Sequence, residues 1–88
     1  MVVSDCDAIA DAYNTHKFCD EPHSVSLGIQ GGCDLDCGGT YSTYAQQALD
    51  ANILNTSSVD QALQRTFLVR FQLGQFDPPS EVEYTSIP

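Results

Sequence analysis

Apolar side chains recur at helical spacing along the last third of the chain. Val59, Leu63, Phe67 and Phe71 are four residues apart, so they share one face of a predicted helix, Ser57–Gly74, whose opposite side is polar. This stretch is the strongest secondary-structure signal in the sequence. The prolines that follow it can neither continue a helix nor donate to a strand ladder, so the chain is expected to leave as an extended linker.

Three shorter stretches also show helical spacing. They span Asp7–Tyr13, Pro22–Gln30 and Tyr41–Ala51. Residues that favour helix ends flank them: Asp20 is suited to capping the second stretch, Gly31 and Gly32 to ending it, and Asn52 to ending the third. For the first, Asp7 or Asp5 is available as the cap.

Two short apolar runs indicate strands. Val2–Cys6 ends at Asp5 and Cys6, and Cys33–Asp36 ends at Asp36 with Cys37 next. A parallel strand would leave its sheet at such a point, where α/β enzymes gather their catalytic groups. The alternation with helices predicts an α/β fold, mostly helical with two short parallel strands. A strand at the very start of the chain has no upstream neighbour, so we expect this sequence to be a piece of a larger fold.

Composition excludes several functions. Eighty-eight residues form at most a small core that usually needs staples or a partner. The net charge of -9, with three Lys and Arg against twelve acids, disfavours a nucleic-acid partner. The sequence has no apolar run of membrane-spanning length and no signal-peptide pattern, so membrane insertion is not expected and a secreted parent would carry its signal upstream.

Four cysteines allow disulfides or metal binding. Outside the cell they would form up to two bridges, with three possible pairings. The spacing contains no CxxC pair, and neither His16 nor His23 stands at zinc-finger distance, so no metal site is predicted.

Three segments together carry a family resemblance. VVSDC, CDLDCGGTY and RFQLGQFDPP resemble glycoside hydrolase family 3, in its β-xylosidase-like branch. The resemblance implies a fragment of a (β/α)8 TIM-type barrel. Residues 1–76 would form the C-terminal part of the family's N-terminal barrel domain, and residues 77–88 the linker to a second domain of α/β sandwich type.

The resemblance places Asp5 at the catalytic nucleophile of a retaining glycosidase, which must be ionised and aimed at the anomeric carbon. The family's acid/base residue belongs to the second domain and is not in this chain. From the residues alone, a helix cap or a turn residue is the favoured interpretation of Asp5. Asp7, Asp34 and Asp36 are expected to be capping, turn or hydrogen-bonding residues.

Two cysteines are implicated by the same resemblance. Cys6 and Cys37 match a disulfide that borders the sugar subsite, where a close wall would exclude the hydroxymethyl group that glucose has and xylose lacks. The alternative is a pair of buried free thiols. Cys19 and Cys33 match no family pattern and stay unassigned.

Other polar and aromatic residues favour structural roles. A lone loop histidine such as His16 is more often structural than a ligand. Tyr41 and Tyr44 suit helix packing better than a sugar groove. Arg65 and Arg70 are expected to face solvent or a partner domain.

The functional expectation is an exo-acting, retaining β-xylosidase that releases xylose from β-linked xylo-oligosaccharides and needs no cofactor. The isolated chain, lacking the rest of the barrel and the sandwich domain, is expected to be inactive. The parent is expected to be extracellular, where the sequon Asn55-Thr56-Ser57 would be usable. The alternatives are a non-catalytic module, either a truncated gene product or a disulfide-stapled binding module, and a plain helical interaction domain in which Val2, Val3 and Leu35 do not form a parallel ladder.

Overall fold

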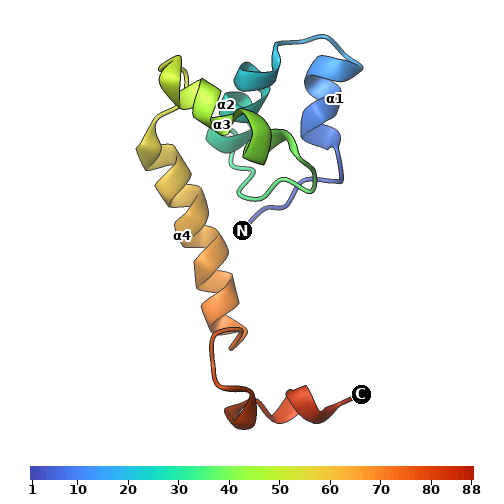
Figure 1. The fold of residues 1–88 in the computed structure, drawn as a ribbon, viewed down its shortest axis with the longest axis vertical. Coiled ribbons are helices and arrows are strands. Elements are labelled where there is room, and N and C mark those ends of the chain that lie inside the picture. Colours follow the sequence, from blue (N-terminus) through green and yellow to red (C-terminus); the bar gives the residue numbers. More distant parts are fainter.

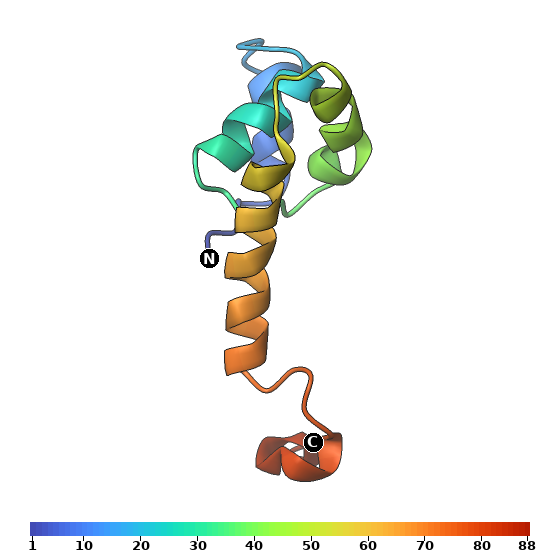
Figure 2. The same cartoon turned by 90° about the vertical axis from the view of Figure 1, so that its left-hand side faces the viewer.

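The computed structural model describes residues 1–88 as an elongated, mostly helical chain, 47 × 27 × 18 Å. Its elements are α1 (Ala8–Asn14), α2 (Glu21–Gln30), α3 (Thr40–Asp50), α4 (Thr56–Gln72) and the 3₁₀ turns η1 (Pro79–Glu81) and η2 (Glu83–Ser86). The first three helices lie together, with the amino-terminal segment along one edge of the group, whereas α4 projects away and carries the two turns at its far end (Figure 1). The quarter-turn view shows the same projection (Figure 2). No helix combines the length and apolar character that crossing a membrane requires.

The helix ends follow local chemistry. The Asp20 carboxylate accepts a hydrogen bond from the His23 amide at 2.9 Å and so caps α2 as predicted. Helix α4 begins at Thr56, one residue before the predicted start, because the Asn55 side chain caps it. Gly32 and Asn52, expected to end α2 and α3, both have positive φ, 96° and 57°.

A small core lies between α2, α3 and the first turns of α4. Its buried apolar side chains are Val25, Ile29, Ala48, Leu54 and Ala62. Polar groups beside it are satisfied: Ser24 donates to the Ile9 carbonyl, and Ser26 to the Ile53 carbonyl. With nine of 88 residues buried, the chain encloses little apolar surface of its own.

The predicted fold class is wrong. The structure has no strand; a single parallel bridge joins Val3 to Leu35. A strand needs repeated pairing with neighbours, and here Val2–Ser4 and Asp34–Leu35 pair only with each other over about one residue. Val2 and Val3 therefore remain about half exposed, at 55% and 45%. The α/β prediction, including the (β/α)8 fragment, gives way to a four-helix chain in which this isolated bridge is the only parallel pairing.

The carboxyl-terminal segment also differs from its prediction. Residues after Phe76 were expected to be extended, but Pro79 begins the short turn η1, since proline suits the first position of a helical turn. The Glu81 amide donates to the Pro78 carbonyl at 2.8 Å, and Thr85 donates to the Pro79 carbonyl at 2.9 Å. Gly74 has φ of 68° where α4 ends.

Candidate functional site

Two segments far apart in the sequence meet beside α1. The Ser4 amide donates to the Leu35 carbonyl and the Asp34 amide to the Val2 carbonyl, each at 2.9 Å. The pairing brings Cys6 next to Cys37, and the two form a disulfide with Cα atoms 4.3 Å apart. The structure thus contains the Cys6–Cys37 bridge that the family resemblance implied, and Asp5 lies directly before it.

Asp5 lies in the turn that leads into α1. Its Oδ1 accepts from the Cys6 amide at 2.9 Å, and its carbonyl accepts from the Ala8 amide at 3.1 Å. The other carboxylate oxygen has no hydrogen-bond partner in the chain, and the residue is exposed. Asp7, rather than Asp5, occupies the N-cap position of α1, with φ of 62° and no capping hydrogen bond from its side chain. The Asp5 carboxylate is therefore held on one side and open to solvent on the other.

A polar network fixes the backbone on both sides of Asp5. Ser4 Oγ accepts from the Cys37 amide at 2.9 Å and lies 3.4 Å from Asp36 Oδ1, to which it donates. Asp36 Oδ2 accepts from the amides of Thr40 and Tyr41, at 2.9 and 3.1 Å, and so caps α3. Asp36 is a hydrogen-bonding residue as predicted. The role of Ser4 had no signal in the sequence, because its partners lie more than thirty residues away.

The buried Asp34 carboxylate pairs with the partly exposed Arg65 guanidinium. Its Oδ1 accepts a hydrogen bond from Arg65 Nε at 2.8 Å and lies 2.7 Å from Arg65 Nη2, and its Oδ2 accepts from the Val2 amide at 2.9 Å. Burial by itself would raise the pKa of Asp34, but the hydrogen bonds from Val2 and Arg65, with the Arg65 charge, hold that pKa below its usual range. The pair ties α4 to the segment before Cys37. Arg65 is an exposed residue, as expected for one that faces solvent or a partner domain, but its guanidinium also pairs with the buried Asp34.

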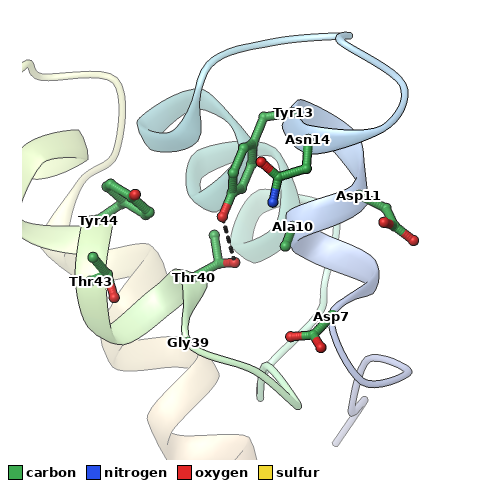
Figure 3. A pocket seen from close by; sticks show the side chains of 9 residues that line it. All are labelled: Asp7, Ala10, Asp11, Tyr13, Asn14, Gly39, Thr40, Thr43 and Tyr44. Carbon is green, nitrogen blue, oxygen red and sulfur yellow. Dashed lines mark hydrogen bonds between the residues drawn. The ribbon is translucent and has the colours of Figure 1, made fainter.

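A polar hollow of about 480 Å³ lies between α1 and the start of α3 (Figure 3). The Tyr13 and Thr40 hydroxyls are 3.4 Å apart on one side of it, and the Asp7 and Asp11 carboxylates lie toward α1 (Figure 3). Asp5 is not among its lining residues. The hollow is therefore a neighbour of the Asp5 segment, not a pocket built around it.

The remaining candidates have structural surroundings. The Tyr41 hydroxyl donates to the Cys33 carbonyl at 3.1 Å, and burial together with this hydrogen bond raises its pKa. The ring of His16 stacks on Phe18 with 5.2 Å between centroids. Cys19 and Cys33 are free and half-buried. No group of three or more His, Cys, Asp or Glu residues is arranged to hold a metal ion.

Comparison with known proteins gives this arrangement a context. A probable exo-1,4-β-xylosidase of Aspergillus terreus is 37% identical over 87 residues, and a xylan 1,4-β-xylosidase of Xylanibacter ruminicola is 38% identical over 90 residues. A solved family 3 exo-β-xylosidase, XlnD, in complex with a xylobiose aziridine activity-based probe, superposes with a TM-score of 0.89 at 26% identity over 98% of this chain. The chain is homologous to a segment of family 3 exo-β-xylosidases.

The match covers nearly all of this chain but little of each relative. The chain spans 11% of the Aspergillus terreus protein, 10% of the Xylanibacter ruminicola protein and 11% of the solved xylosidase. No family model matches the sequence. The recognition of the family from three short motifs is thus confirmed, whereas the roles assigned to Asp5, Cys6 and Cys37 within it stay predictions.

Proposed function

We propose that this chain is the nucleophile-bearing segment of a retaining, exo-acting β-xylosidase that releases xylose from β-linked xylo-oligosaccharides. The observation that carries the proposal is the homology to exo-β-xylosidases over 98% of the chain, combined with an exposed carboxylate at Asp5 in a turn fixed on both sides. Residues 1–76 would belong to the catalytic domain and residues 77–88 would lead to a further domain.

The setting of Asp5 suits a nucleophile. In a retaining mechanism the carboxylate attacks the anomeric carbon and forms a glycosyl ester while the leaving oxygen takes a proton; water then hydrolyses the ester. Such a group must be aimed with one oxygen free. The Cys6 amide holds Asp5 Oδ1 at 2.9 Å and leaves Oδ2 free to attack. The disulfide and the Ser4–Cys37 hydrogen bond restrain the backbone that carries it.

The disulfide supports a preference for pentoses. Cys6 is adjacent to Asp5, so the Cys6–Cys37 bridge lies within one residue of the proposed reacting group. A rigid wall there would collide with the hydroxymethyl group of glucose and leave xylose unhindered, a discrimination of about 1–3 kcal/mol. The second carboxyl of the mechanism, at about 5 Å from the first, would come from polypeptide outside these 88 residues. The isolated chain is accordingly expected to be inactive.

Secretion of the parent is part of the proposal. A disulfide persists in an oxidising compartment, and the structure holds one beside an exposed sequon at Asn55. Both features support an extracellular enzyme that acts on xylan fragments.

The test replaces the matching segment of the Aspergillus terreus relative by this chain and measures hydrolysis of p-nitrophenyl β-xyloside. Asp5→Asn should lower kcat by at least about a thousandfold, whereas Asp7→Asn, two residues away and off the proposed reaction path, should lower it less than about tenfold. In Asp5→Gly, added azide should restore turnover and yield α-xylosyl azide, because azide replaces the missing nucleophile. A chimera that keeps its activity in Asp5→Asn would refute the assignment and favour a non-catalytic module.

A further inference from the structure

The apolar face of α4 is uncovered. Leu63, Phe67 and Phe71 lie along this helix and Phe76 follows it; we call these four residues the α4 stripe. Their exposed fractions are 47%, 41%, 64% and 47%. The sequence pattern is that of a helix packed against a core, yet within the chain only the first turns of α4, at Ala62 and Val59, reach one. Exposed apolar surface of this extent marks an interaction site.

The α4 stripe is a preformed surface. Phe76 folds back onto the helix, so that its ring centroid lies 4.5 Å from that of Phe71 and 6.1 Å from that of Phe67. The Arg70 guanidinium lies 5.0 Å from the Phe76 ring and 5.8 Å from the Phe67 ring, which fixes the cluster further. Aromatic rings already held in place lose little conformational entropy when a partner covers them.

We infer that the α4 stripe docks on the remaining polypeptide of a family 3 exo-β-xylosidase. The solved xylosidase reproduces 98% of this chain with a TM-score of 0.89, so α4 projects from its helical neighbours in the same way within a protein about nine times as long. A helix that leaves its own core yet keeps one direction in two proteins only 26% identical is held by surroundings outside the matched segment. The polypeptide outside the matched segment is therefore what covers the α4 stripe.

A second copy of the chain is a poorer occupant. Each copy carries a net charge of -9, which opposes close association of two of them. Arg65 and Arg70 are two of the three cations, but Arg65 is paired with Asp34 and Arg70 lies on the aromatic rings, so little positive charge is left to offset the repulsion. This inference does not depend on Asp5 being the nucleophile.

The experiment compares the same substitutions in two contexts. Phe67→Glu and Phe71→Glu are made in the isolated 88-residue chain and in the Aspergillus terreus chimera described above. Gln72→Glu is the control, because it adds the same charge one residue away on an exposed position outside the stripe. In the isolated chain all three should shift Tm by less than about 4 °C, as for exposed sites. In the chimera, Phe67→Glu and Phe71→Glu should lower Tm by more than about 10 °C or abolish soluble folding, and Gln72→Glu should not.

Hydroxyl-radical footprinting needs no variant and gives a second measurement. Phe67, Phe71 and Phe76 should be oxidised in the isolated chain and protected in the chimera. Equal oxidation in both would overturn the inference, as would a chimera that is insoluble while its parent is soluble, since the stripe then fails to fit the body proposed to cover it. Stripe protection in the isolated chain, together with a dimer in sedimentation that Phe67→Glu disperses, would assign the face to self-association. Xylosidase activity is not a readout here, so failure of the Asp5 proposal leaves this result interpretable.

Discussion

The Cys6–Cys37 disulfide closes a loop with a sequence separation of 31 residues. For a loop of that length, the loss of chain entropy in the unfolded state stabilises the fold by about 3.7 kcal/mol. An 88-residue domain is typically stable by about 4–13 kcal/mol, and the small buried core places this chain toward the lower value. We therefore expect removal of this one bridge, in a Cys6→Ala/Cys37→Ala variant, to remove most of the free energy of unfolding.

Urea denaturation followed by far-ultraviolet circular dichroism measures this effect. With a slope of about 1–2 kcal/mol per molar urea, the midpoint of the double variant should lie about 2–4 M below that of the oxidised chain. Dithiothreitol should lower the oxidised chain to the same midpoint and leave the variant unchanged, while Cys19→Ala, at a free cysteine, should stay within about 1 M. Midpoints of the oxidised chain and the double variant that agree within about 0.3 M would refute the loop-entropy reasoning.

Three further predictions concern single side chains. Arg65→Met removes the partner of the buried Asp34 carboxylate, so it should lower the free energy of unfolding by about 2 kcal/mol, a value reduced to allow for the partly exposed guanidinium. The control Arg70→Met should lower it by less than about 1 kcal/mol. Urea titration of both variants measures the two losses, and equal losses would contradict the prediction. Burial raises the pKa of Asp34, but its hydrogen bonds outweigh burial and lower that pKa, so the stability that Asp34 contributes should be present above about pH 4 and be lost as the pH falls through the lowered pKa. In Arg65→Met this loss should begin at a higher pH. The free energy of unfolding of both proteins is measured between about pH 2 and pH 6, and parallel pH dependences of the original chain and the variant would contradict the prediction. Asn55→Ala should cost about 1 kcal/mol by removing the cap on the Ser58 amide, and Asn55→Asp, which keeps the accepting oxygen, should cost much less; equal thermal shifts would exclude the capping role.

Local signals in the sequence predicted local structure well. The four helices lie within about two residues of their predicted positions, because capping and stop residues such as Asp20 and Gly32 act within one helical turn. The strands failed for the opposite reason. Val2–Cys6 has the composition of a buried strand, but a strand forms only when neighbours pair with it, and this chain supplies a single bridge.

In the candidate site too, some contacts could be predicted from the sequence and others could not. The family resemblance placed Cys6 and Cys37 together, and the structure joins them in a disulfide. The ion pair between Asp34 and Arg65 joins residues 31 positions apart, and neither periodicity nor composition indicates which acid a given arginine will meet. Long-range polar contacts of this kind depend on how helices pack, which a single sequence does not specify.

Asn55 carries two roles through different atoms of one amide. Its Oδ1 accepts from the Ser58 amide at 2.8 Å and from the Ser57 hydroxyl at 2.7 Å, whereas a glycan on the sequon is joined through Nδ2. Attachment of an oligosaccharide would therefore leave the cap of α4 intact. The glycan would lie at the N-terminus of α4, the longest helix. The exposed Phe71 and Phe76 rings are at the other end of that helix, so the glycan would add bulk and hydration without covering them.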